Sequence, residues 1–262
     1  GLMTKSKDLF TGSRRKFMKG ASATFALAAA GLSAPQIARA AGAVKIGLIH
    51  PATGWAAYPA APLRYGAQMA IADLNAAGGI KSMGGAALEA VLGDSQTKPE
   101  IGAAEVEKMN EAGVHAIQGC YQSAVGLAAS AAAAKYNIPF SVDVGVSDKL
   151  VQRGLSNVFR MADGYGRIAA DASVNLAEIN KAAGSPAKTV AIVHEESEFG
   201  TGTAKLVTKA LASHGLEVIE TIKHANPTRN FDNIALRLKS AKPDIIMPIN
   251  YTGEYILLAN TL

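Results

Sequence analysis

The sequence predicts an α/β protein made of two lobes, each with a parallel sheet covered by helices. Short apolar runs alternate with helical stretches of about 10 to 18 residues, as in βαβ proteins. Several runs are apolar throughout, which is typical of strands buried on both faces. The alternation forms two series that meet near residue 160.

The first series begins with a strand at residues 44–50, followed by a helix at 63–77. Gly78 and Gly79 end that helix, because glycine readily adopts the left-handed conformation of a helix stop. The other strands of this series are expected at 87–92, 114–118, 138–142 and 157–161, and the other helices at 99–111 and 123–136.

The second series is shorter. Its strands are expected at 188–194, 216–223 and 244–248, and its helices at 166–183, 201–214, 231–240 and from 253 onward. Three strands are few for a sheet, since the average is about five or six. The last helix has barely begun at Leu262. We therefore expect a fragment, with a second lobe that is incomplete at the C-terminus.

The N-terminal segment has the features of an export signal. Arg14 and Arg15 precede an apolar run at 20–32, and Ala38-Arg39-Ala40 has the small-residue pattern of a cleavage site. The paired arginines indicate the twin-arginine class. The apolar run is too short to span a bilayer, which disfavours a membrane anchor. The expected division is a signal peptide at 1–40, an N-terminal lobe at 41–160 and a truncated second lobe at 161–262.

The charge is unevenly distributed. The net charge is +5, yet residues 1–40 hold seven basic residues and one acidic residue. The remaining 222 residues carry 19 basic and 20 acidic groups. The basic balance therefore belongs to the leader, and no nucleic-acid partner is expected. Cys120 is the sole cysteine, so no internal disulfide is possible.

The patterns that would indicate an enzyme are missing. One cysteine cannot hold an iron–sulfur cluster, and the five histidines form no close ligand pair. Ser123 is not in a G-x-S-x-G motif. We interpret His194-Glu195-Glu196 as the polar rim of a cleft. The sequence therefore predicts no metal, no cofactor and no enzyme. An exported redox enzyme and a receptor sensor domain remain less favoured alternatives.

Several segments resemble a known family. Residues 46–54 read Ile-Gly-Leu-Ile-His-Pro-Ala-Thr-Gly, and residues 72–80 read Ala-Asp-Leu-Asn-Ala-Ala-Gly-Gly-Ile. These blocks resemble the leucine/isoleucine/valine-binding proteins of ABC importers, and the likeness extends over residues 44–258. The resemblance implies two Rossmann-like lobes (the type I periplasmic-binding fold) with a small ligand in the cleft between them. It also implies a periplasmic location and ABC importer permease subunits as partners.

The loops that follow the strands of the first lobe are the candidate site, because ligands of open α/β sheets bind there. Tyr121 and Ser123 follow the third strand, and Ser123 opens a helix. A helix N-terminus offers free N–H groups to a carboxylate. The resemblance assigns Ser123 as the carboxylate-binding serine; a plain helix cap is the alternative.

The loop after the fourth strand contains Val144 and Val146. The resemblance implies that the carbonyl of Val144 and a threonine at the position of Val146 hold the head group of an amino acid. Valine lacks that hydroxyl. Asp143 either compensates for it or caps the turn before Lys149.

Aromatic residues complete the expected site. The resemblance implies a cleft tyrosine near Pro59, a role that falls to Tyr58 or Trp55. Phe199 and Tyr251 match family tyrosines that line the apolar side of the cleft, while the family's acidic partner for the amino group falls beyond Leu262. The expected ligand is a branched-chain or other hydrophobic amino acid. An aromatic or other small carboxylate without an amino group is the alternative.

Overall fold

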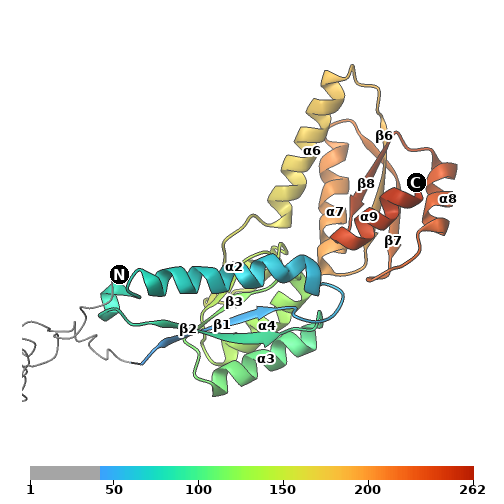
Figure 1. Ribbon diagram of the computed structural model, residues 1–262. Coiled ribbons are helices and arrows are strands. Elements are labelled where there is room, and N and C mark those ends of the chain that lie inside the picture. Colours follow the sequence, from blue (N-terminus) through green and yellow to red (C-terminus); the bar gives the residue numbers. More distant parts are fainter. Residues whose placement is uncertain (1–41) are drawn as a thin grey trace, which may run out of the picture.

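The computed structural model describes residues 42–262, and the predicted signal peptide lies outside them. Figure 1 shows two lobes, each a sheet flanked by helices. The elements of the first lobe are β1 (Val44–His50), α2 (Ala57–Ala76), η1 (Lys81–Met83), β2 (Leu88–Asp94), α3 (Pro99–Glu111), β3 (Ala116–Gly119), α4 (Ser123–Lys135), β4 (Phe140–Val142), α5 (Lys149–Gln152) and β5 (Val158–Arg160).

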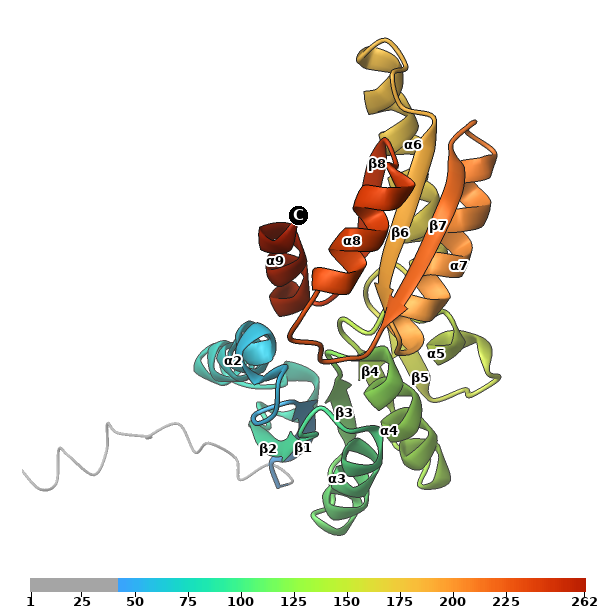
Figure 2. The ribbon, with the colours of Figure 1, turned by 90° about the vertical axis from the view of Figure 1, so that its right-hand side faces the viewer.

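The first sheet has the order β2-β1-β3-β4-β5, and every pairing is parallel. Helices α3 and α4 cover one face and α2 runs along the other (Figure 2). The main core lies under α3 and α4, where Val106, Met109 and Val125 pack against Ile49 and Ile117. Because all five strands are parallel, they end at one edge of the sheet, and the loops that follow them lie together.

The second lobe is built in the same way on a smaller sheet. Its elements are α6 (Tyr165–Ala182), β6 (Thr189–Glu195), α7 (Glu198–Ala212), β7 (Glu217–His224), α8 (Asp232–Ala241), β8 (Ile245–Ile249) and α9 (Thr252–Thr261). The parallel strands lie in the order β7-β6-β8. Helices α6 and α7 cover one face of the sheet, and α8 and α9 cover the other. The predicted α/β class with parallel sheets is confirmed.

Two helices begin earlier than the sequence predicts. Helix α2 starts at Ala57 rather than at residue 63, although Pro62 lies inside it. Proline lacks an N–H, but its fixed φ angle suits a helix near its N-terminus. Helix α7 starts at Glu198 rather than at 201. This earlier start places Glu198 and Phe199 on the first turn of a helix instead of in a loop.

In the described part of the chain, residues 161–164 connect the two lobes. The residues on either side of this crossing form hydrogen bonds with the loop after β4. Arg160 donates from Nη1 to the carbonyls of Val146 and Ser147, at 3.2 and 2.9 Å. Asp148 Oδ2 accepts the N–H of Gly166 at 3.0 Å. A side chain at Gly164 would collide with Asp148 and Arg160. The crossing therefore holds the two lobes close to the candidate site.

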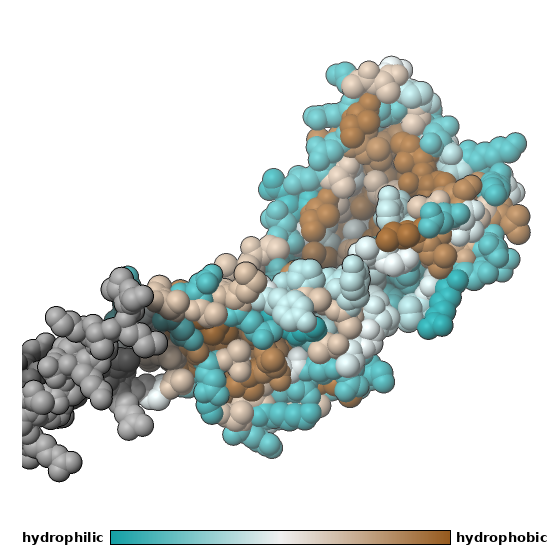
Figure 3. All heavy atoms as spheres, viewed as in Figure 1, coloured by the Kyte–Doolittle hydropathy of each residue, from teal (hydrophilic) through white to brown (hydrophobic). Residues whose placement is uncertain are grey.

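Hydrophobic side chains are exposed on both lobes (Figure 3). A hollow of about 440 Å³ lies between α2 and the first sheet, next to Ile46, Leu48 and Ile71. In the second lobe a hollow of about 180 Å³ lies between α9 and β8. No helix among residues 42–262 is both long and apolar enough to cross a membrane.

Candidate functional site

Ser123 is the first residue of α4 and lies at the edge of the first sheet where the strands end. Its N-cap neighbour Gln122 has extended backbone angles, and no side chain caps the helix. Ser123 is only 2% exposed, and its Oγ accepts the N–H of Ser147 at 3.2 Å. The alternative that Ser123 is a plain helix cap is therefore wrong. The first-turn N–H groups of α4 have no intrahelical partner and suit an anion.

The loop after β4 faces Ser123 with two apolar side chains, Val144 and Val146. Asp143 does not join them, because its Oδ2 is 2.6 Å from Nε2 of the fully buried His50. Asp143 Oδ1 accepts the N–H of Val144 at 2.8 Å. The alternative that Asp143 caps the turn before Lys149 is wrong, since Asp148 is the N-cap of α5.

Tyr251 stands at the centre of an aromatic cluster between the lobes. The cluster combines one ring from the β8–α9 junction with three rings from α7 and the first lobe. Ring centroids of Trp55, Phe199 and Tyr121 lie 4.7, 5.2 and 5.7 Å from that of Tyr251. The rings are tilted relative to one another, at centroid distances that aromatic pairs favour. Burial, with the nearby Glu195 charge, raises the pKa of the Tyr251 hydroxyl well above its usual range, so the hydroxyl stays protonated.

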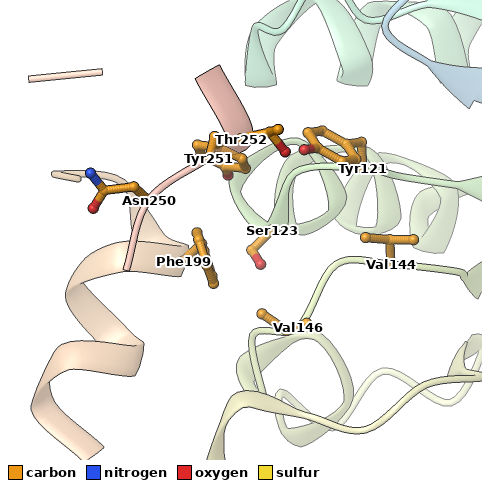
Figure 4. A pocket seen from close by; sticks show the side chains of 8 residues that line it. All are labelled: Tyr121, Ser123, Val144, Val146, Phe199, Asn250, Tyr251 and Thr252. Carbon is orange, nitrogen blue, oxygen red and sulfur yellow. The ribbon is translucent and has the colours of Figure 1, made fainter. Parts of the chain in front are cut away.

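A cavity of about 200 Å³ lies between Ser123 and the ring of Tyr251. Its walls are contributed by both lobes, and they consist of Tyr121, Ser123, Val144, Val146, Phe199, Asn250, Tyr251 and Thr252. Figure 4 shows the Ser123 hydroxyl between Phe199 on one side and Val144 on the other, with Val146 below it. No acidic side chain lines this cavity among residues 42–262. Six of the eight residues proposed from sequence meet here.

The sequence prediction missed Asn250 and Thr252. They follow β8 directly, so the rule that ligands bind beyond the ends of strands would have included them. Both amide atoms of Asn250 are buried without a hydrogen-bond partner in the described part of the chain.

Trp55 and Tyr58 do not line this cavity. They line a neighbouring one of about 440 Å³, which shares Tyr251 and Thr252 with the first. Trp55 contacts Tyr251, whereas Tyr58 is 91% exposed. Of the two candidates for the cleft aromatic, Trp55 is the one next to the Ser123 cavity.

Two buried carboxylates of the second lobe, Glu195 at the end of β6 and Glu254 in α9, accept hydrogen bonds from backbone N–H groups. Glu195 is fully buried and accepts the N–H of Ser197 at 2.6 Å and the N–H of Gly200. It therefore stabilises the start of α7 from a buried position near Tyr251, rather than as an exposed group of the cleft rim. Burial raises the pKa of Glu254, which accepts the N–H of Thr228 at 3.0 Å. Residues 42–262 contain no group of three or more His, Cys, Asp or Glu placed to hold a metal.

The profile of the periplasmic binding protein family matches residues 43–262. The chain belongs to this family. Membership implies an extracytoplasmic location, and it supports the expectation of a binding protein rather than an enzyme. The described folding pattern is that of a type I periplasmic binding protein.

Individual relatives agree with this membership. The chain is 29% identical over 221 residues to a Leu/Ile/Val-binding protein homologue of Brucella suis, covering 82% of this chain and 54% of that protein. It therefore spans about half the length of the curated relatives that it matches.

Solved structures share the fold. One is a branched-chain amino acid transporter substrate-binding protein of Streptococcus pneumoniae in complex with isoleucine (TM-score 0.67, 23% identity, 79% of this chain and 56% of that one). Another is a solute-binding protein of Rhodopseudomonas palustris in complex with benzoate (TM-score 0.70, 22% identity, 79% and 55%).

Proposed function

We propose that this periplasmic binding protein captures a small carboxylate with an apolar body and delivers it to the permease subunits of an ABC importer. The supporting observation is the cavity between the lobes, where the hydroxyl of Ser123 and the N-terminus of α4 face valine and aromatic walls. In such a pocket the hydroxyl and the helix N–H groups bind the carboxylate. The walls take the apolar part of the ligand.

A hydrophobic amino acid such as leucine or isoleucine is the first candidate ligand. The relatives whose alignments cover 82% of this chain are named Leu/Ile/Val-binding protein homologues. Tyr121, Tyr251 and Asn250 supply polar atoms around the cavity for an amino group. The side chains of Val144, Val146 and Phe199 form the apolar wall.

A carboxylate without an amino group, such as benzoate, is the second candidate. It is favoured by the lack of an acidic side chain among the described residues that line the cavity. An ammonium group whose partners are missing costs on the order of 1–3 kcal/mol for each unsatisfied hydrogen bond. That cost equals about one to two decades of affinity.

A ligand screen on the intact mature protein separates the two candidates. We expect leucine, isoleucine, valine or phenylalanine to raise its melting temperature more than benzoate or phenylacetate does. The opposite order would assign the protein to the second candidate. Stabilisation by none of the six compounds would contradict the proposed function.

Ser123→Ala tests the placement of the carboxylate. A hydrogen bond to a charged group contributes about 1.5–3 kcal/mol, so Kd for the best ligand should rise about 10- to 150-fold. Val146→Thr is the matched variant on the other side of the cavity. It should strengthen leucine binding and leave benzoate binding within about twofold, since the added hydroxyl serves an amino group. An unchanged Kd in Ser123→Ala, measured by calorimetry, would show that the carboxylate binds elsewhere.

A further inference from the structure

A polar cluster joins the two lobes beside the cavity. Ser147, in the loop before α5, donates from Oγ to Oε1 of Glu198 at 2.9 Å. Lys149 Nζ is 2.9 Å from Oε2 of the same carboxylate. The hydroxyl of Tyr165 donates to Oε1 at 3.3 Å. Ser147 and Tyr165 are buried, so the centre of the cluster is screened from solvent.

This cluster reaches the candidate site through Ser147. The N–H of Ser147 donates to Oγ of Ser123, and its side chain donates to Glu198. The N–H occupies a lone pair of the Ser123 hydroxyl, which leaves the hydroxyl proton free to be donated into the cavity. Glu198 directly precedes Phe199, a wall of the same cavity. Its contact with Ser147 therefore fixes the anion-binding group and the aromatic wall relative to one another.

The bonds of Glu198 connect residues that belong to different lobes. Ser147 and Lys149 lie in the first lobe, whereas Glu198 begins α7 of the second. Tyr165 belongs with Glu198: its ring lies against α7 at Gly202, where an added Cβ would be 2.8 Å from the ring. If the lobes separate, Glu198 loses Ser147 and Lys149 and keeps Tyr165. The cluster therefore stabilises the arrangement in which the lobes are together.

We propose that Glu198 is a positioning residue for ligand capture. It stabilises the closed arrangement and orients the Ser123 hydroxyl through Ser147, without touching the ligand itself. The proposal rests on the proposed function insofar as Ser123 binds the ligand. The contribution of Glu198 to closure does not depend on which ligand is bound.

Three variants of the intact mature protein test this role, with L-leucine and benzoate as probes. Glu198→Ala removes the three bonds that Glu198 makes and leaves only the contact between the hydroxyls of Ser147 and Tyr165 (3.4 Å). Glu198→Gln keeps an acceptor for Ser147, and Lys149→Met removes the exposed ion pair. The matched control is Asp171→Asn, which removes the Arg167–Asp171 pair (2.6 Å) within α6. The rate constants for association and dissociation are measured by stopped-flow fluorescence.

We expect Glu198→Ala to raise the dissociation rate constant about tenfold and to change the association rate constant little, as interface mutations commonly do. Glu198→Gln should restore most of the wild-type value. Lys149→Met should have a smaller effect, because exposed ion pairs contribute little. Asp171→Asn should equal the wild type. A merely structural role of Glu198 would lower the melting temperature and leave dissociation unchanged. If Glu198→Ala does not fold, Lys149→Met decides: a dissociation rate constant above the wild-type value supports the role, and a wild-type value contradicts it.

A measurement without ligand separates this proposal from the proposed function. Spin labels are placed at exposed Lys135 and Lys209, one on each lobe, in a Cys120→Ala background, and their distance distribution is recorded. Glu198→Ala should shift the distribution to longer distances, and Asp171→Asn should not. If the wild type binds none of the six compounds of the ligand screen, the proposed function fails and this distribution alone decides on Glu198. A wild-type distribution in Glu198→Ala, or a wild-type dissociation rate for a bound probe, would overturn the proposal.

Discussion

Trp55 and Tyr58 lie three positions apart in the same segment, yet their surroundings differ sharply. The ring of Trp55 is 4.7 Å from that of Tyr251, at an interplanar angle of 60°. Tyr58 is 91% exposed. The indole therefore supports the side chain that closes the Ser123 cavity, while the phenol ring of Tyr58 faces solvent.

Replacing each of these aromatic residues by alanine should separate their roles. Trp55→Ala removes an aromatic pair, which contributes about 1 kcal/mol, so Kd for leucine should rise about fivefold. Tyr58→Ala serves as the control and should leave Kd within about twofold. Calorimetry on the intact protein measures both. Equal losses in the two variants would mean that the ligand extends into the cavity beside Tyr58.

The sequence could predict that His50 and Asp143 lie near each other, but not that they form a buried pair. Each residue was expected at the end of a strand, and parallel strands end at the same edge, so their proximity was predictable. Their pairing was not, because Asp143 also had a local alternative as a helix cap. The full burial of His50 decides between these alternatives, since a buried carboxylate and imidazole are stabilised by bonding to each other. Burial depends on tertiary packing that no local pattern records.

At the scale of elements, Asp244 connects the first residues of two neighbouring strands. Its Oδ2 accepts the N–H of Lys188 at 2.7 Å and the N–H and hydroxyl of Thr189 at 2.9 Å each. Thr189 begins β6, and Asp244 precedes β8. The carboxylate therefore sets the register of these strands at the end of the sheet opposite the candidate site.

The stability of the second lobe should depend on this carboxylate and on pH. The bonds from Lys188 and Thr189 lower the pKa of Asp244 below 3.8. The lowered pKa means that the ionised form stabilises the fold above pH 3.8, and that this stabilisation is lost as the pH falls through the lowered value. Asp244→Ala should therefore lower the melting temperature at pH 7, and its difference from the wild type should shrink at about pH 3. Calorimetry at several pH values measures this, and equal melting temperatures at pH 7 would contradict it.

Most elements could be predicted from sequence, and the errors share a cause. Strands buried on both faces give continuous apolar runs, so β1 and β6 were placed within one residue. Helix starts were less certain, because neither α2 nor α7 has a side-chain cap. The start of α7 is instead bonded by Glu195 from the preceding strand. The sequence therefore located the Ser123 side of the cavity well, but it missed the cluster around Glu198.

For the molecule as a whole, the two lobes have separate hydrophobic cores. One core lies between the first sheet and α3 and α4, and two smaller ones lie on either side of the second sheet. Apolar side chains are also exposed on α2, including Met69 and Leu74, and on α6, including Ile179. The second sheet has β7 and β8 as edges among the described residues. Surfaces of this kind are normally covered or mark sites of association.

The span of residues 42–262, expressed by itself, should therefore associate and melt without a sharp transition. Its exposed apolar surface favours self-association. Its separate cores are connected covalently by one short crossing and otherwise by the Tyr251 and Glu198 clusters, so they can unfold independently. Light scattering after size-exclusion chromatography measures the first property and calorimetry the second. A curated relative of full length is the control, since the chain spans about half the length of such relatives, and it should be monomeric with a cooperative transition. A monomeric span 42–262 with one sharp transition would show that the α2 and α6 surfaces are stable in water and that the two lobes fold as one unit.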